Sequence, residues 1–130
     1  MSAVDEVLAR ARAGLTRVAP EDVESLPADR LLVDIRPLHN RVADGEIPAA
    51  VPIERIVLEW RLDPRGTHRI PGFTEDTTVI VFCNEGYSSS LAARDLRELG
   101  LPNATDLVGG FRAWRAAGLP VRAGGTQAVV

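Results

Sequence analysis

The feature that most restricts the fold is a pair of short strand-like runs that lack polar–apolar alternation. Residues 31–35 are mostly apolar and are followed by charge, and residues 77–82 are β-branched or aromatic throughout. Strands that are buried on both faces have this composition, and they occur mainly in parallel sheets covered by helices. The two runs therefore predict the interior of a mostly parallel sheet.

Helical patterns alternate with these runs. Apolar residues recur on one helix face over residues 4–11, and Ser2 and Gly14 are suitable as the N-cap and the stop. Residues 88–99 form the clearest helix, which Gly100 ends. Weaker patterns predict helices at 20–23, 38–43, 54–61 and 110–117, strands at 15–18 and 104–108, an extended segment at 47–53 and a loop at 62–76. The alternation predicts a three-layer α/β/α sandwich around a sheet of about five strands.

The length of 130 residues predicts one domain, and no repeat or linker divides it. We expect an N-terminal helical extension at 1–15, the domain at 16–123 and a flexible C-terminal tail at 124–130. Hydrophobic residues make up 45% and charged residues 25% of the chain, which is ordinary for a globular protein and argues against disorder.

Composition also restricts the chemistry. Cys83 is the only cysteine, so an internal disulfide and a cysteine metal cluster are excluded, and we expect no metal and no cofactor. All 15 basic residues are arginines, which removes lysine chemistry, and a net charge of −3 without a basic block argues against nucleic acid binding. No signal peptide or long apolar stretch is present, so we expect no membrane association and a reducing, cytoplasmic location.

Cys83 follows the strand at 77–82, and the helix at 88–99 begins five residues later. Ligands of α/β proteins bind at the carboxyl ends of the strands, where a tight loop and a helix N-terminus can present N–H groups to an anion. These groups stabilise a thiolate and lower the pKa of a cysteine. An isolated cysteine is more often buried and inert, but this position favours a functional thiol.

Four segments together resemble the rhodanese-like (sulfurtransferase) family over about residues 16–121. They are Asp34-Ile35-Arg36, Gly45-Glu46-Ile47-Pro48-Ala49-Ala50, the loop Cys83 to Ser89, and Gly109-Gly110-Phe111-Arg112-Ala113-Trp114 continuing through Gly118-Leu119-Pro120-Val121. Each segment alone is weak, whereas four in the same order are specific. The resemblance implies a rhodanese-like fold and a sulfurtransferase.

The resemblance also implies the mechanism. Cys83 would take a sulfane sulfur from thiosulfate or a persulfide donor and pass it to a thiol or cyanide acceptor through a cysteine persulfide. With one cysteine, the acceptor must be a second molecule; the protein itself is expected to be a monomer or a homodimer. The residues of the expected loop are Asn84, Glu85, Gly86, Tyr87, Ser88 and Ser89. The candidate supporting residues are Asp34, Arg36 and Arg61, although we favour a structural ion pair for the first two and a solvated face for Arg61.

This chain departs from the family pattern at four positions. Glu46 replaces a histidine and Ala49 a glycine, and both sites look structural. Ser88 stands where many relatives have a cation or threonine, and Glu85 adds a negative charge to the loop. These two residues shift the expected donor modestly from thiosulfate towards a persulfide.

Two other functions stay open. Cysteine phosphatases use a similar loop, but they need an arginine that closes it, and here that place holds Ser88 in a loop one residue short. A non-catalytic, regulatory or sulfur-relay module is the stronger alternative, because a fold alone does not determine function. Among other residues, we expect Trp60 and Trp114 to pack in the core, His39 and His68 to lie on the surface, and Ser88–Ser90 to cap the helix.

Overall fold

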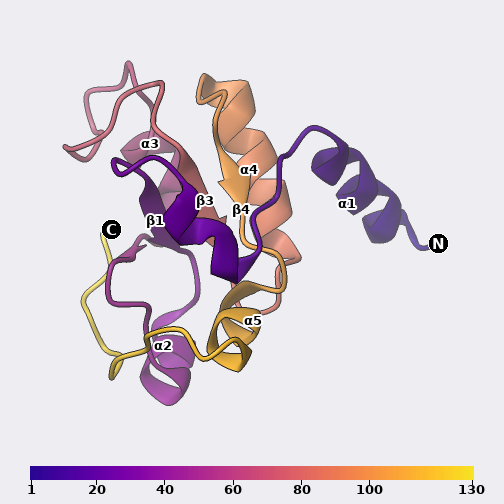
Figure 1. Ribbon diagram of the computed structural model, residues 1–130. Coiled ribbons are helices and arrows are strands. Elements are labelled where there is room, and N and C mark those ends of the chain that lie inside the picture. Colours follow the sequence, from indigo (N-terminus) through magenta and orange to yellow (C-terminus); the bar gives the residue numbers. More distant parts are fainter.

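Four parallel strands form the centre of the structure, a computed structural model that describes residues 1–130 (Figure 1). The strand order is β2-β1-β3-β4. The sheet therefore places β3 beside β1 in the middle and puts the two shortest strands at its edges. The strands are β1 (Leu31–Asp34), β2 (Val51–Pro52), β3 (Val79–Phe82) and β4 (Thr105–Asp106).

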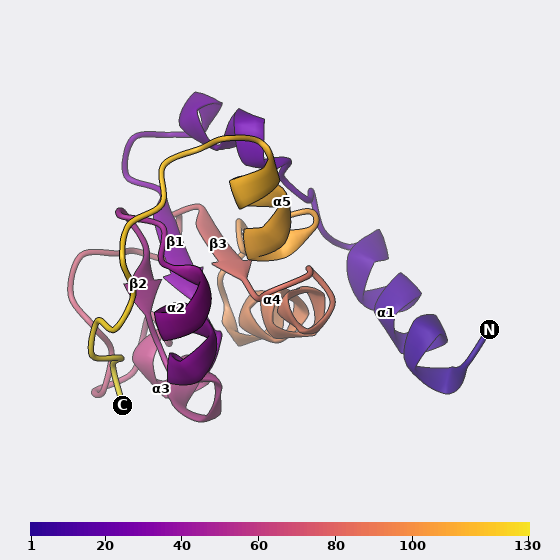
Figure 2. The same ribbon diagram turned by 90° about the horizontal axis from the view of Figure 1, so that it is seen from below.

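Helices cover both faces of the sheet (Figure 2). The α-helices are α1 (Ala3–Ala13), α2 (Leu38–Asp44), α3 (Leu58–Arg61), α4 (Ser88–Leu99) and α5 (Gly110–Ala116), and the 3₁₀ helices are η1 (Pro20–Ser25) and η2 (Arg55–Val57). One core cluster packs α3 and α4 against the sheet, and the other packs η1 and α5 against its opposite face. The α/β sandwich predicted from the sequence is confirmed, and α1 lies outside it beside α4.

The central strand explains the two-sided core. Val79 and Val81 face the cluster with α3 and α4, whereas Ile80 and Phe82 face the cluster with η1 and α5. All four side chains are fully buried, because successive strand residues point to opposite faces and helices cover both. The run of β-branched and aromatic residues at 77–82 is thus the sequence counterpart of a strand at the centre of three layers.

The sheet has four strands rather than the expected five. The predicted strand at 15–18 reduces to one parallel bridge between Val18 and Leu107. Val18 donates to the Asp106 carbonyl and its own carbonyl accepts from Val108, so the segment extends the sheet edge by one residue.

Trp60 is 61% exposed, so the prediction that it packs in the core is wrong. The helical pattern at 54–61 forms two short pieces, η2 and α3, and α3 turns Leu58 and Leu62 into the core. Trp60 lies two residues from each of them, about 200° around the helix, and therefore points away from the sheet. Trp114 is buried as predicted, and its indole N–H donates to the Pro120 carbonyl at 2.9 Å.

The C-terminal segment, residues 124–130, lies along the body of the protein instead of extending freely. Val129 pairs with Ile53 in a parallel bridge, and its N–H donates to the Pro52 carbonyl at 2.9 Å. These contacts join backbone groups about 76 residues apart, so they leave no local pattern in the sequence, and the flexibility of the tail stays a prediction. None of the helices is both long and apolar enough to cross a membrane.

Glu46 anchors the same segment through buried polar contacts. Its carboxylate accepts from the Arg41 guanidinium at 2.7 Å and from the Thr126 hydroxyl at 2.6 Å. Burial raises the pKa of Glu46, but the hydrogen bonds from Thr126 and Arg41 and the charge of Arg41 outweigh it, so the pKa lies below its ordinary 4.5. The ionised carboxylate is therefore part of what holds the C-terminal segment in place.

Glu46→Gln should lower the free energy of unfolding near neutral pH by about 2–4 kcal/mol, because Arg41 would keep a buried charge without its carboxylate. Since the folded-state pKa is lowered, Glu46 stabilises the protein above pH 4.5, and this contribution disappears as the pH falls through the folded-state value. Urea unfolding at a series of pH values should show the gap between wild type and variant closing in acid. The exposed Glu75 provides the control, and an equal loss in Glu75→Gln would contradict the assignment.

Candidate active site

Cys83 lies at the carboxyl end of β3, at the floor of an open pocket of about 330 Å³. The pocket is formed by two segments: the turn that follows β1 and the loop between β3 and α4. Its lining residues are Ile35, Arg36, Pro37, Asn40, Cys83, Asn84, Glu85, Tyr87 and Ser88. The parallel pairing of β1 with β3 brings these two segments together, because Asp34 pairs with Phe82 and the chain leaves both strands at the same edge.

Helix α5 holds the first part of the cysteine loop from behind. The N–H of Phe111 donates to the Cys83 carbonyl at 2.9 Å, and the N–H of Arg112 donates to the Asn84 carbonyl at 3.1 Å. Gly110 makes this contact possible, because a Cβ there would fall 2.6 Å from the Cys83 carbonyl oxygen. The Gly109-Gly110-Phe111 segment therefore serves the active-site loop directly.

Gly86 forms the turn of the loop. It has a φ of +86°, and a Cβ would fall 2.8 Å from the Gly109 nitrogen, so only glycine fits without strain. Its N–H donates to the Cys83 sulfur at 3.2 Å. Its carbonyl points the other way and accepts from two guanidinium groups, Arg12 at 2.6 Å and Arg17 at 3.1 Å.

Three loop carbonyls, those of Cys83, Asn84 and Gly86, are thus bound from outside the pocket. In a trans peptide the N–H points opposite to the carbonyl. The N–H groups that follow these carbonyls therefore point away from the anchoring groups. This arrangement can stabilise negative charge on the sulfur or on a bound anion, because preorganised N–H donors need no rearrangement to accept it.

Ser89 and Ser90 do not cap α4, contrary to the prediction. The N-cap residue is Tyr87, and no side chain caps the helix. Both hydroxyls instead donate to Asp106 on β4, at 2.8 and 2.7 Å. Asp106 is fully buried and also binds Arg17 at 2.8 Å, so it ties the start of α4 to the segment that precedes the sheet.

The pKa of Cys83 lies below its ordinary value. Burial alone raises it, but hydrogen bonds from the Ser89 and Ser88 side chains and from the N–H groups of Ser89 and Gly86 outweigh the burial. The Ser89 hydroxyl has a single proton to donate, and two acceptors lie within its reach: the Cys83 sulfur and the Asp106 carboxylate. The site therefore favours a thiolate, which is the nucleophilic form of cysteine.

Asp34 and Arg36 form a buried ion pair at 2.8 Å, and Arg36 also donates to the Gly45 carbonyl. The guanidinium lies over the Phe111 ring at 3.9 Å, so it connects the turn after β1 with α5. Arg36 lines the pocket, and one of its nitrogens, Nη1, is buried without a hydrogen-bond partner. Arg36 therefore has two roles: it holds neighbouring elements together, and it lines the pocket.

Arg61 is not in the pocket, although it was a sequence candidate. It donates to the carbonyls of His68 and Val130. Glu85 is in the loop but is exposed, and an ion pair with Arg112 at 3.2 Å offsets its charge.

Sequence reasoning missed four residues of the site: Asn40, Arg12, Arg17 and Asp106. Asn40 shares the pocket through α2, whereas the other three lie behind the loop. Asp106 ends β4 and lies in the middle of the predicted strand at 104–108, where a charged residue in a buried strand was a usable signal. No pattern in the sequence connects Arg12 or Arg17 with a loop about 70 residues later.

A family model described as "Rhodanese-like domain" matches residues 19–117. The chain belongs to the rhodanese-like domain family. The match contains β1 to β4, the cysteine loop and α5.

Individual relatives agree with this placement. A sulfurtransferase of Allochromatium vinosum is 34% identical over 93 residues, which cover 72% of this chain and 78% of the relative. The structure of a Rhodopseudomonas palustris protein of unknown function, described as a possible tyrosine phosphatase, has a TM-score of 0.83 and 31% identity and covers 94% of this chain and 96% of the other. The polysulfide-sulfur transferase homodimer of Wolinella succinogenes has a TM-score of 0.70 and 26% identity, covering 91% and 85%.

Other relatives are much longer than this chain. The proteins named adenylyltransferase and sulfurtransferase in Candida albicans and Zea mays are 29% and 34% identical over the matched part. The match covers 23% of the first and 17% of the second.

Ser89→Ala should raise the pKa of Cys83 and slow its alkylation by iodoacetamide at neutral pH about two- to tenfold, because the thiolate loses a hydrogen bond. Ser90→Ala is the matched control, since Ser90 donates to the same Asp106 oxygen but, unlike Ser89, is not hydrogen-bonded to the sulfur. Because Ser90 also accepts from Arg12, Ser90→Ala should slow alkylation, but less than Ser89→Ala does. The pH dependence of the alkylation rate measures the shift. A control variant as slow as Ser89→Ala would contradict the direct role of Ser89.

Proposed function

We propose that this protein is a sulfurtransferase in which Cys83 carries a sulfane sulfur from a donor to an external acceptor. The observation that carries the proposal is the anchored loop: at the end of the central strand it surrounds a pocket-lining cysteine of lowered pKa with N–H donors. Membership of the rhodanese-like family and the names of several relatives, among them a sulfurtransferase and a polysulfide-sulfur transferase, support the same reaction class.

In the first half-reaction the Cys83 thiolate attacks the outer sulfur of the donor. A bond forms between the two sulfurs, and the donor's S–S bond breaks. The leaving group, sulfite from thiosulfate or a thiolate from a persulfide, departs with the electron pair. The terminal sulfur of the new Cys83 persulfide carries negative charge, which the N–H groups of the loop stabilise.

In the second half-reaction an acceptor nucleophile attacks the terminal sulfur of the persulfide. The Cys83 thiolate leaves with the electron pair of the S–S bond, and no oxidant or reductant is consumed. Because Cys83 is the only cysteine, the acceptor must be another molecule, a thiol or cyanide. A low pKa suits both steps, since the same thiolate is nucleophile and leaving group.

The donor is thiosulfate, a persulfide or a polysulfide, and the charges around the pocket favour the last two over thiosulfate. Ser88 and Glu85 line the pocket without offering a cation, and Arg36 is neutralised by Asp34, which weakens attraction for a dianion. The openness of the pocket leaves room for a thiol-borne donor, including one on a protein. A single unpaired cysteine suits a reducing compartment such as the cytoplasm.

A phosphatase is the alternative suggested by the description of one structural neighbour. Phosphate binding in a cysteine loop requires a guanidinium fork in front of the loop. Here Ser88 and Ser89 occupy the positions after Tyr87, and Ser89 points to Asp106 instead. The arginines that contact the loop bind its outer carbonyl, so they do not provide this fork.

A regulatory module that only binds a partner, or relays its sulfur, is the other alternative. A module that only binds a partner has no need for a stabilised thiolate, so the hydrogen bonds to the Cys83 sulfur argue against it. A relay needs the same reactive thiol and differs from the enzyme in lacking catalytic release of the sulfur to a free acceptor.

Incubation with a sulfane-sulfur donor should add one sulfur atom to the protein, and addition of a thiol or cyanide should remove it. Intact-mass spectrometry measures both steps with thiosulfate, polysulfide and glutathione persulfide in turn. Cys83→Ser should show no adduct and no turnover. The absence of an adduct with all three donors would contradict the proposal. Cys83-dependent hydrolysis of an aryl phosphate would contradict it as well. Adduct formation without catalytic release would favour the relay module.

Ser88→Arg should raise kcat/KM for thiosulfate about three- to tenfold more than for a neutral organic trisulfide, because it brings a cation to the mouth of the pocket. Ser88 is exposed, so the longer side chain fits without repacking the core. Ser88→Gln, of similar length but uncharged, is the matched control. An unchanged or lower rate with thiosulfate would show that this position does not limit recognition of the dianion.

A further inference from the structure

Two arginines outside the family match bind the active-site loop. Arg12 and Arg17 precede residue 19, where the match begins, and both donate to the Gly86 carbonyl, at 2.6 and 3.1 Å. Gly86 is the residue whose N–H donates to the Cys83 sulfur. The N-terminal segment therefore contacts the turn of the loop directly, from the side opposite the pocket.

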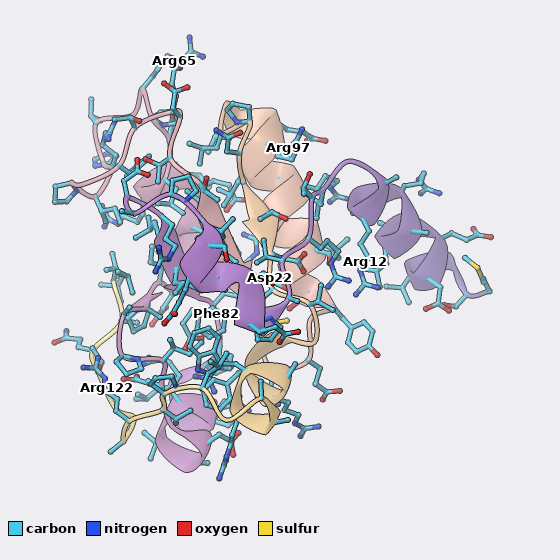
Figure 3. All side chains as sticks on the ribbon, in the orientation of Figure 1. Arg12, Asp22, Arg65, Phe82, Arg97 and Arg122 are labelled. Carbon is cyan, nitrogen blue, oxygen red and sulfur yellow. The ribbon has the colours of Figure 1, made fainter.

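Arg12 makes three contacts at the junction of the loop and α4. Besides the Gly86 carbonyl, it donates to the Ser90 hydroxyl at 3.1 Å, and its guanidinium lies 5.6 Å from the centre of the Tyr87 ring. Figure 3 shows Arg12 between α1 and the N-terminal end of α4. A planar guanidinium can make these contacts at once, whereas a lysine ammonium is a single point of charge.

The charges of the two arginines are balanced differently. Arg17 is paired with Asp106 at 2.8 Å. None of the ion pairs in the structure includes Arg12. Arg12 is also half-buried, so solvent screens its charge less than that of an exposed residue. The loop thus has an uncompensated cation behind its turn, although no cation stands at Ser88.

We propose that Arg12 is a positioning residue of the active site: from helix α1 it holds the Gly86–Tyr87 peptide so that its N–H faces the sulfur side of the loop, and its charge favours the thiolate and the persulfide. The carbonyl of this peptide points to Arg12, and the trans geometry sends the Tyr87 N–H the opposite way. A guanidinium on the carbonyl also polarises the peptide and strengthens that N–H as a donor. The effect on sulfur transfer rests on the proposed function, whereas the effect on the thiol does not.

The other charged groups around Cys83 are compensated. Arg36, on the turn after β1, is paired with Asp34, and Glu85, in the loop, is paired with Arg112 of α5. Asp106 of β4 binds Arg17 and accepts from Ser89. Removal of Arg12 should therefore change the electrostatic balance at the loop more than removal of a charge that already has a partner.

The experiment compares Arg12→Ala, Arg12→Lys and Arg10→Ala in the full chain. Arg10 is on the same helix, is exposed and makes no side-chain hydrogen bond or ion pair, so its removal controls for the loss of one positive charge from α1. The readout is the rate of Cys83 alkylation as a function of pH, with circular dichroism and thermal unfolding as checks that each variant is folded.

Arg12→Ala should shift the alkylation midpoint to higher pH and lower the rate at neutral pH about three- to tenfold, while Arg10→Ala stays within twofold of wild type. Arg12→Lys keeps the charge but not the three contacts, so it should recover less than half of the loss on a logarithmic scale. A midpoint in Arg12→Ala equal to that of Arg10→Ala would overturn the proposal. Full recovery by Arg12→Lys would overturn the positioning role, because charge alone would then suffice.

Sulfur transfer gives a separate readout. With any donor that loads wild-type Cys83, Arg12→Ala should lower kcat more than it raises KM, since the residue acts on the loop and not on the donor. If no donor loads the wild-type protein, the proposed function fails, but the alkylation profiles still decide whether Arg12 positions the loop. A loss confined to KM would contradict positioning.

Discussion

The site depends on the binding of loop carbonyls from outside the pocket. The N-terminus of α5 binds the carbonyls of Cys83 and Asn84, and two guanidinium groups bind that of Gly86. Each of these bonds orients a peptide so that the N–H that follows points away from the anchor. A loop of this length could adopt many shapes alone, and it is the anchors that select one in which the sulfur meets N–H donors.

In this arrangement one set of groups stabilises the sulfur anion and another holds the shape of the loop, whereas a cationic side chain in the pocket would combine the two tasks. Backbone N–H groups and serine hydroxyls stabilise the sulfur anion, while the arginines stay behind the loop and hold its shape. Asp106 connects these layers, because it accepts from Ser89 and pairs with Arg17. The front of the pocket is thereby left with little net charge, which agrees with a donor that carries its sulfur on a thiol.

Much of the site could be predicted from the sequence, since its parts are local. Cys83 follows a strand of β-branched residues, and Gly86 and the helix at 88–99 come directly after it, so the loop was evident. The capping role of Ser88–Ser90 was wrong, and Arg61 lies outside the pocket, because both depend on where a side chain points. Arg12 could not be found, since its hydrogen bond joins residues 74 positions apart.

The sequence alone determined the α/β sandwich, its family and the position of the candidate catalytic cysteine, because strand and helix periodicity and the order of short motifs are local features of the chain. Only the tertiary structure decided which side chains complete the site. It reduced the fifth strand to a single bridge, attached the C-terminal segment through Glu46 and brought α1 behind the loop. These are contacts between segments far apart in the chain, and their free energy depends on the packing of the whole domain, which no local pattern encodes.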